Sequence, residues 1–390
     1  MATGGLALLL NPDTQPHSFD GLEVIGKIVY IFDLVIFSLI TAAITYRFIR
    51  YPGRLKSSLT HPTESLFFAT SHLALASIIG CIGRYGVPAA GEWLVVVYRV
   101  LFWIYFAITF CNSVGQYVLL FTSPRLKIQD MTPAWDLPIF PVMLSGTIAA
   151  IGAPFQPMEK KIPMIICGLL SQGLGMMVSM LMYASYLRRM INYGLPSPQS
   201  RPGMFIAVGP PSFTSLAIIG LANAWPTGKQ SYFGGSEGEA ARMVLLTLAT
   251  VVSVFIWSLA FWFFCISVIA NLLVSWPFIT KEKAIHFSLN WWAFIFPNVG
   301  FTIATITIGR ELDSQGILWV GSIMTIFLVA MYIFVLVHHV LAVWRRKILW
   351  PGRDEDTYVM ERMGKIERLK GQIPAGSGLV DINEKKARQE

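Results

Sequence analysis

Long hydrophobic stretches, separated by short polar segments, make up most of the chain. Most of these stretches exceed the roughly 20 residues that an α-helix needs to cross a bilayer. The first one is shorter, since ten helical residues rise only about 15 Å, and we expect its N-terminal part to be truncated. The pattern predicts ten transmembrane helices, at about residues 1–10, 22–48, 65–84, 93–121, 136–153, 162–187, 203–224, 241–275, 287–309 and 317–344.

The odd-numbered stretches contain glycine, and the fifth, seventh and ninth contain proline as well, whereas the even-numbered stretches are longer and more regular. Proline removes a helical hydrogen bond, and hydrocarbon tolerates such a break only where neighbouring helices or water satisfy the freed carbonyl. We therefore predict five helical hairpins, each with a broken inner helix and a regular outer helix. Close packing of glycine is the alternative explanation. The predicted break positions are Gly4, Gly146, Gly209, Pro210, Pro211 and Gly300.

The composition indicates a polytopic membrane protein. Only 13% of the residues are charged and 54% are hydrophobic, with a mean hydropathy of +0.58, whereas about 25% of residues are charged in soluble domains. We expect one transmembrane domain at 1–349 and a charged, mostly disordered tail at 350–390. The 4 cysteines lie in apolar runs, which argues against a disulfide framework or a zinc site, and we expect no metal and no cofactor.

Basic residues follow the even-numbered stretches. Arg47 and Arg50 end the second stretch, Arg188 and Arg189 end the sixth, and Arg345 follows the tenth. Because Lys and Arg concentrate in cytoplasmic loops, we predict a multi-pass protein with both termini in the cytoplasm. The net charge of +8 reflects these loops and does not indicate nucleic-acid binding.

Several arginines lie within or beside the predicted helices, where a buried charge is costly and usually functional. A guanidinium can bind two carboxylate oxygens at once. We expect Arg84 and Arg310 to form an outer vestibule, Arg201 an inner one, and Arg99 to face the path from the fourth helix. Contact with lipid headgroups is the alternative for the first three, and an interhelical ion pair with an acid is the alternative for Arg99.

Each helix break would direct a half-helix N-terminus, with its partial positive charge, towards the membrane midplane, which favours an anion. Asp33 and His72 lie inside predicted helices and are candidates for proton coupling; a structural polar contact and a buried core histidine are the alternatives. Hydroxyl and amide groups beside the breaks are candidate anion ligands: Thr3, Ser145, Thr147, Ser212, Asn298 and Thr302.

Phe296 directly precedes Pro297 in the middle of the ninth stretch. A bulky aromatic side chain at a helix break can close a path, since hydrophobic constrictions are a known gating device. We therefore predict that Phe296, with Pro297, forms a gate. Ordinary core packing is the alternative, because the chain contains 26 phenylalanines.

Four sequence strings resemble one known family. The strings MATGG, FPVMLSG, RPGMFIAVGPPSF and WWAFIFPNVGF are similar to the tellurite-resistance/dicarboxylate transporter family, which includes fungal malic acid permeases, fungal sulfite efflux pumps and plant slow anion channels. With GLEVIGKIVYI and GEWLVVVYRVL, the chain looks most like the malic acid permeases. The resemblance implies an all-α integral membrane fold of ten helices, arranged as five hairpins in pseudo-five-fold symmetry around a central pore. It also implies a homotrimer and a pore closed at the position of Phe296.

The function that the resemblance implies is transport of malate, succinate and related C4-dicarboxylates across the plasma membrane, with protons as further partners. The alternative is a sulfite or small inorganic anion exporter on the same fold. A membrane-embedded enzyme would need paired acids, a histidine cluster or a nucleophile with its base. Asp33 and His72 show no such spacing, so we expect no enzymatic activity and no catalytic residues.

Overall fold

The structure is a computed structural model, and its described parts are helical. The predicted tail at 350–390 lies outside the described residues. The chain divides into two compact units, Met1–Leu336 and Val337–Glu390, and the residues discussed below lie mainly in the first. The structure describes residues 1–60, 64–122, 128–227, 238–275 and 287–348.

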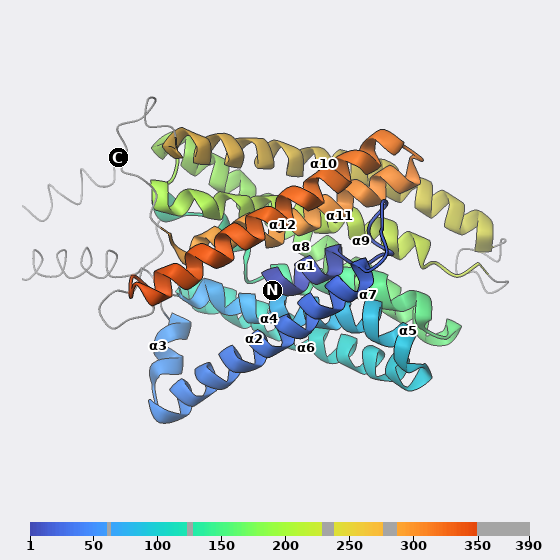
Figure 1. Cartoon of the computed structure of the whole chain (residues 1–390), viewed down its shortest axis with the longest axis horizontal. Coiled ribbons are helices and arrows are strands. Elements are labelled where there is room, and N and C mark those ends of the chain that lie inside the picture. The colour runs from blue at the N-terminus through green and yellow to red at the C-terminus, as the bar shows by residue number, and fades with distance from the viewer. Residues whose placement is uncertain (61–63, 123–127, 228–237, 276–286, 349–390) are drawn as a thin grey trace, which may run out of the picture. The chain divides into compact units, whose positions relative to one another are not determined.

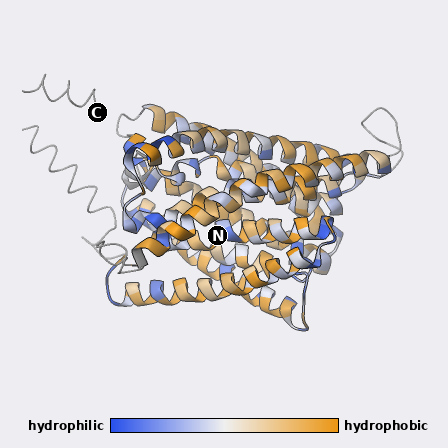
Figure 2. Ribbon diagram, turned by 90° about the horizontal axis from the view of Figure 1, so that it is seen from above, coloured by the Kyte–Doolittle hydropathy of each residue, from blue (hydrophilic) through white to orange (hydrophobic). Residues whose placement is uncertain are grey.

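Within the described residues, 8 helical stretches are long and apolar enough to cross a membrane. Figure 2 shows that these helices are hydrophobic along most of their length, with hydrophilic residues mainly near their ends. The predicted class, an all-helical multi-pass membrane protein, is confirmed. The long helices are α2 (Leu22–Arg50), α4 (Glu64–Cys81), α6 (Glu92–Thr122), α8 (Met158–Tyr193), α9 (Gly209–Asn223), α10 (Gly238–Ser275), α11 (Phe296–Glu311) and α12 (Gln315–Trp344). Three of these stretches, those of α4, α9 and α11, reach spanning length only together with adjoining helical turns.

Two shorter helices complete the predicted set. Helix α1 (Ala2–Leu9) corresponds to the first stretch, and α7 (Phe140–Gly152) to the fifth, where a short 3₁₀ turn, Ala153–Phe155 (η4), extends it. Two further short helices lie between the spans, α3 (Arg54–Thr60) and α5 (Val87–Ala90).

Burial separates the inner helices from the outer helices. In the stretch Pro198–Asn223, 89% of the most apolar window is buried, against 6% for Leu22–Arg50. Helices α1, α4, α7 and α11 are likewise largely buried, whereas α6, α10 and α12 expose many large apolar side chains. Figure 1 shows α10 along the top of the view and α2 and α6 along the bottom. The alternation predicted from glycine and proline therefore matches the observed burial.

The five inner helices contact one another in a closed order. Helix α1 packs against α4, α4 against α7, α7 against α9, α9 against α11, and α11 against α1 again. These helices are the odd-numbered stretches of the sequence. A pseudo-five-fold arrangement around a central pore stays a prediction.

Three inner helices begin at or within a few residues of the end of a 3₁₀ segment. Helix α7 follows Pro133–Asp136 (η3), α9 follows Pro198–Val208 (η5), and α11 follows Leu289–Phe294 (η6). Proline lies in the first turn of each α-helix, where its missing N–H removes no intrahelical bond. The predicted breaks at Gly209, Pro210 and Pro211 therefore coincide with a helix start.

The other three predicted breaks are wrong. Gly4, Gly146 and Gly300 lie inside the regular helices α1, α7 and α11. A Cβ atom on Gly300 would lie 2.5 Å from the ring of Phe213, and Cβ atoms on Gly4 and Gly146 would also overlap neighbouring side chains. These glycines permit close helix packing, which was the alternative explanation for them.

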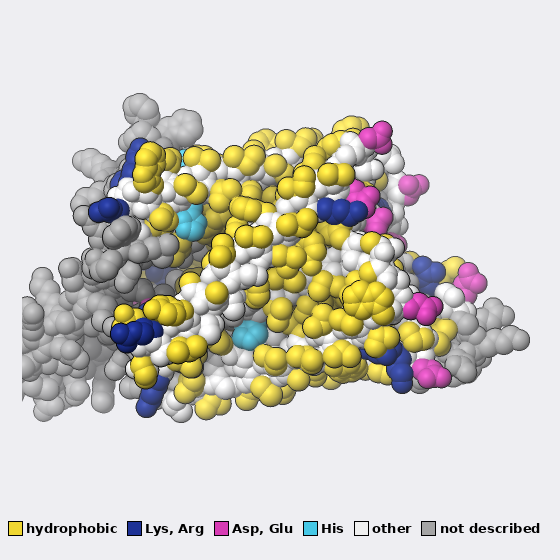
Figure 3. Space-filling model, turned by 60° about the horizontal axis from the view of Figure 1, so that its bottom comes forward, with side chains coloured by type: hydrophobic (Ala, Val, Ile, Leu, Met, Phe, Trp, Pro, Cys, Tyr) yellow, Lys and Arg dark blue, Asp and Glu magenta, His cyan; other side chains and the backbone are white. Residues whose placement is uncertain are grey.

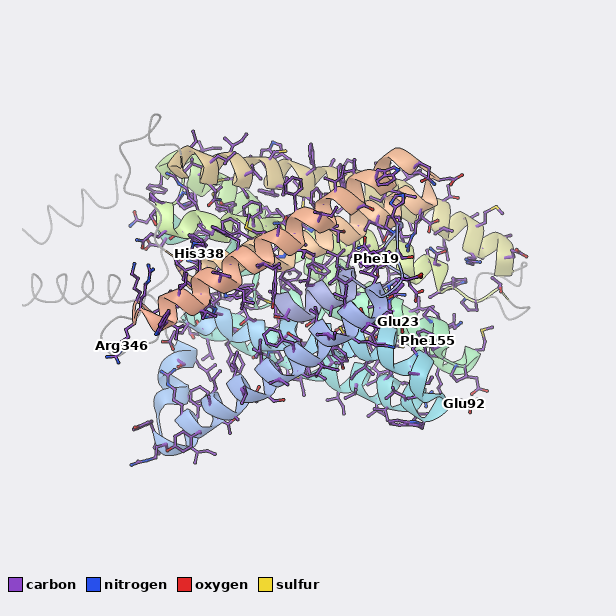
Figure 4. All side chains as sticks on the ribbon, viewed as in Figure 1. Phe19, Glu23, Glu92, Phe155, His338 and Arg346 are labelled. Atoms are coloured by element: carbon purple, nitrogen blue, oxygen red, sulfur yellow. The ribbon has the colours of Figure 1, made fainter. Side chains whose placement is uncertain are left out.

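Charged side chains gather at the ends of the helices. Figure 3 shows a mainly hydrophobic surface between the ends, with Lys, Arg, Asp and Glu side chains mixed at the right of the view. Figure 4 labels Phe19, Glu23, Glu92 and Phe155 at one end of the first unit. We call this end, where α1, α4 and α11 finish and where Arg84 lies, the Arg84 end.

Candidate functional site

Three phenylalanine rings from three inner helices contact one another at the helix starts. The ring centroids of Phe140 and Phe213 are 5.6 Å apart, those of Phe140 and Phe296 are 6.1 Å apart, and those of Phe213 and Phe296 are 5.2 Å apart. All three side chains are buried. We call this group the phenylalanine cluster; Phe296 was predicted from the sequence, whereas Phe140 and Phe213 were not.

Each ring of the cluster packs against a glycine on the next inner helix in the closed order. A Cβ atom on Gly5 would lie 3.1 Å from the Phe296 ring, which is tighter than nearly all real contacts. The glycines therefore provide the space that the rings occupy. The pairs are Phe296 with Gly5, Phe140 with Gly209, and Phe213 with Gly300.

The break before α9 leaves the carbonyl of Ala207 without a backbone donor. Pro210 and Pro211 occupy the positions three and four residues further on, and neither has an N–H group. The hydroxyl of Tyr183, on the outer helix α8, donates a hydrogen bond of 3.0 Å to this carbonyl. A neighbouring helix thus satisfies the break, as hydrocarbon surroundings require.

Most polar groups beside the cluster already use their donors. The hydroxyls of Ser212 and Thr302 donate to Val208 O at 2.6 Å and to Asn298 O at 2.8 Å. The amide nitrogen of Asn298 donates to Phe294 O at 2.8 Å. Since a hydroxyl has a single O–H, Ser212 and Thr302 would have to release their present partners to donate to an anion.

Two predicted ligands on α7 keep a free donor. Ser145 is fully buried, and among the described residues neither its hydroxyl nor that of Thr147 has a hydrogen-bond partner. The hydroxyl of Thr3 lies 3.0 Å from that of Tyr332, and either of the two can be the donor. Among the described residues, Ser145 and Thr147 are therefore the predicted hydroxyl ligands without a hydrogen-bond partner.

The structure brings Arg84 and Arg310 together at the Arg84 end, around Asp13. Arg84 Nη1 lies 4.0 Å from Asp13 Oδ2. Arg310 donates from Nη1 to Asp13 O at 2.5 Å and from Nη2 to Thr14 O at 3.0 Å. Asp13 was not predicted from the sequence, because it lies in a loop far from both arginines along the chain.

Arg99 and Arg201 lie elsewhere. Arg99 Nη1 donates to Gln156 Oε1 at 3.3 Å. Its partner is therefore an amide, and the alternative prediction of an interhelical ion pair with an acid is wrong. Arg201 is buried and donates to Pro196 O at 3.1 Å and to Ala270 O at 3.2 Å, which links η5 to α10. Contact of either arginine with a substrate stays a prediction.

The two proton-coupling candidates have different surroundings. Asp33 on α2 is buried, faces Gly4, and its Oδ1 lies 3.7 Å from the nitrogen of Met1. His72 on α4 is half-buried, and its ring packs against Phe68 with centroids 5.6 Å apart. Proton binding by either residue stays a prediction.

The carboxyl group of Asp136 is fully buried and was not predicted as a site residue from the sequence. Asp136, one helical turn before Phe140, accepts a hydrogen bond of 2.7 Å from Ser179 on its Oδ2, while its Oδ1 has no partner in the described part of the chain. It stands at the predicted start of the fifth stretch, and a charged residue at such a boundary looks like an interfacial residue.

Together, the buried inner helices, their broken starts and the aromatic cluster between them define an all-helical membrane transport protein. The described residues contain no group of three or more His, Cys, Asp or Glu side chains that could hold a metal ion. The chain belongs to the voltage-dependent anion channel (SLAC1) family, whose model matches residues 1–340. The resemblance seen in the sequence strings is confirmed, and the protein is a transporter or channel and not an enzyme.

Relatives of known and unknown function match most of the chain. It is 38% identical over 358 residues to a malic acid transport protein of Schizosaccharomyces pombe, covering 92% of this chain and 80% of that protein. It is 25% identical over 343 residues to the sulfite efflux pump SSU1 of Arthroderma benhamiae, covering 86% of each chain. It is 21% identical over 292 residues to an uncharacterized transporter of Methanocaldococcus jannaschii, covering 73% of this chain and 75% of that protein.

Proposed function

We propose that this chain transports malate, succinate and related C4-dicarboxylates across the plasma membrane. The observation that carries the proposal is the similarity, along most of its length, to a malic acid transport protein. Two arginines close together at one end of the first unit fit a substrate with two carboxylates, since each guanidinium can bind one of them.

The proposed path runs between the five inner helices, in a pseudo-five-fold arrangement. Helices α7, α9 and α11 start at Phe140, Gly209 and Phe296 beside the phenylalanine cluster. A helix N-terminus carries about half a positive charge, and several such ends directed at one region would favour an anion there.

Phe296 is the proposed gate, together with Phe140 and Phe213. Three buried rings in mutual contact form a hydrophobic constriction of the kind that closes ion paths. Pro297 fixes the start of α11 next to the ring. Opening would require the Phe296 side chain to change its rotamer.

The proposed ligands follow the path from the Arg84 end inwards. Arg84 and Arg310 form the outer vestibule, and beyond them Ser145 and Thr147 offer the unused hydroxyl donors. Arg201 is the proposed inner vestibule residue. The remaining proposed ligands each have a hydrogen-bond partner already, and of these Ser212 and Thr302 would have to release it to donate to an anion; they are Arg99, Thr3, Ser212, Asn298 and Thr302.

Orientation, assembly and coupling complete the proposal. The Arg84 end faces outside, both termini are cytoplasmic, and the protein assembles as a homotrimer through the exposed apolar faces of its outer helices.

A membrane potential of 100 mV contributes about 2.3 kcal/mol per charge, which favours efflux of a dianion from a cell that is negative inside. Uptake against that potential requires protons, with Asp33 and His72 as the proposed coupling residues.

Uptake of radiolabelled malate into proteoliposomes tests the substrate. We expect excess succinate to inhibit malate uptake and excess sulfite to leave it unchanged. The second candidate function, sulfite export, is favoured by the similarity to sulfite efflux pumps. Vesicles that take up sulfite but not malate would contradict the dicarboxylate proposal and support that second candidate.

A further inference from the structure

The turn that follows α1 holds the carboxylate of Asp13 in a defined position. The backbone nitrogen of Asp13 donates to Asn11 Oδ1 at 3.0 Å, and that of Thr14 donates to Asn11 O at 2.9 Å. The Asp13 side chain itself is 73% exposed. The turn is therefore fixed by its backbone, while the carboxylate remains accessible to solvent.

Arg84 reaches this carboxylate from an unusual helical turn. The segment Ile82–Gly86 (η1) is a π-helical turn between α4 and α5. Turns of this kind are rare in proteins overall, but those that occur frequently lie at functional sites. In the part of the chain that the structure describes, the contact of Arg84 with Asp13 is its only ion pair or hydrogen bond.

Arg310 holds the same turn from the other side. It lies in the last turn of α11 and donates to the carbonyls of Asp13 and Thr14. Those two bonds use two of the five N–H groups of a guanidinium. Arg310 thus fixes the turn and adds a second positive charge beside Arg84, and it keeps donors for a further oxygen.

The contact between Arg84 and Asp13 is loose. At 4.0 Å it is longer than a charge-assisted hydrogen bond and lacks the two parallel bonds of a close arginine–carboxylate pair. Exposed pairs of this kind contribute little stability and are screened by salt. A carboxylate that approaches Arg84 more closely could therefore replace that of Asp13.

We propose that Arg84 and Arg310 form an entry site for a substrate carboxylate, and that Asp13 is a tethered occupant which the substrate displaces. The inference rests on the proposed function for its substrate class, a dicarboxylate. A group attached by a short segment competes with an effective concentration in the millimolar range. Asp13 would then raise the apparent KM for malate and would not assist transport.

If Asp13 competes with the substrate, its removal should lower the KM for malate, which a purely structural contact would not do. If Asp13 only stabilised the turn, its removal would lower the amount of folded protein or the maximal rate. If Asp13 competes with substrate, its removal lowers KM and leaves the maximal rate unchanged. Asp20, an exposed acid in the same connection between α1 and α2, offers a matched control for the loss of one negative charge.

The test is the KM for radiolabelled malate in proteoliposomes that contain the full chain or its variants. For Asp13→Asn we expect a KM lower by roughly two- to fivefold, the range that an exposed ion pair allows. Asp13→Glu should keep a KM close to that of the unchanged protein, and Asp20→Asn should not alter it. Arg84→Gln should raise KM, and adding Asp13→Asn to it should have no further effect, because the two residues act through one contact.

Three results would overturn the inference: an unchanged or higher KM for Asp13→Asn, an equal decrease for Asp20→Asn, or the same decrease in the Arg84→Gln background. If the unchanged protein carries malate, such results leave the proposed function intact. If the unchanged protein carries no malate, the proposed function fails, and this inference fails with it.

Discussion

At the scale of single residues, the phenylalanine cluster surrounds the side chain of Phe296, the proposed gate. Phe296 contacts two other rings and a glycine, so its rotamer is restricted from several sides. Opening of the proposed gate would require these contacting rings to move together. The glycine opposite each ring keeps the rings close to the neighbouring helix.

Replacing Phe296 by alanine should increase malate leak through the protein. The substitution removes the ring that contacts both Phe140 and Phe213, and we expect a several-fold higher malate current at equal amounts of protein in the membrane. Truncation of a buried phenylalanine also costs about 3–5 kcal/mol of stability. The amount of correctly assembled protein must therefore be measured with the current.

Phe102→Ala is the matched control for this substitution. Phe102 is a fully buried phenylalanine on the outer helix α6, so its loss weakens packing to a similar degree but leaves the cluster intact. Equal leak in the two variants would show that Phe296 acts through core packing.

The sequence allowed prediction of Phe296 but not of its partners. The proline after Phe296 marks a helix start, and the same Phe-Pro pair occurs at Phe140. Among 26 phenylalanines, however, contact between residues on three different helices depends on the helix arrangement. The roles of Gly4, Gly146 and Gly300 were mispredicted for a related reason, since a helix break and close packing both favour glycine.

At the scale of the elements, the broken inner helices depend on groups supplied by the outer helices. Tyr183 on α8 satisfies the carbonyl of Ala207. Tyr105 and Tyr98 on α6 donate to carbonyls inside the regular helix α7, to Pro141 O at 2.9 Å and to Ile148 O at 2.8 Å. The outer helices α6 and α8 therefore contribute hydrogen bonds to the inner part of the protein as well as apolar surface.

Replacing Tyr183 by phenylalanine should destabilise the protein. The variant keeps the ring but leaves a buried carbonyl without a donor, which costs about 1–3 kcal/mol. Thermal unfolding in detergent, followed by fluorescence, should show a lower midpoint than for the unchanged protein.

Tyr193→Phe serves as the control, because Tyr193 lies at the end of the same helix and is 49% exposed. Its midpoint should stay near that of the unchanged protein. Identical midpoints for the two variants would contradict the proposed role of the Tyr183 hydroxyl.

The sequence predicted the alternation of inner and outer helices but not the form of the breaks. Glycine and proline marked the odd-numbered stretches, and these are the helices that are buried. The 3₁₀ segments before α7, α9 and α11 were not predicted, because hydropathy does not distinguish a 3₁₀ turn from an α-helix. The π-helical turn around Arg84 was missed for the same reason.

At the scale of the whole molecule, α1, α4, α7, α9 and α11 contact one another in a closed order. Hydropathy alone predicts spans but not which helices meet, so the expectation of a pseudo-five-fold arrangement came from the family resemblance, and the contact order itself comes from the structure. The family match over residues 1–340 confirms the class of protein. The substrate stays a proposal.

Voltage-driven efflux of malate from proteoliposomes tests whether malate is the substrate. Proteoliposomes are loaded with radiolabelled malate, and a potassium gradient with an ionophore sets the inside negative. A dianion gains about 4.6 kcal/mol at 100 mV, so we predict that efflux becomes faster as the potential grows and that excess internal succinate slows it. Malate that stays inside at every potential, while chloride or sulfite leaves the same vesicles, would contradict the account.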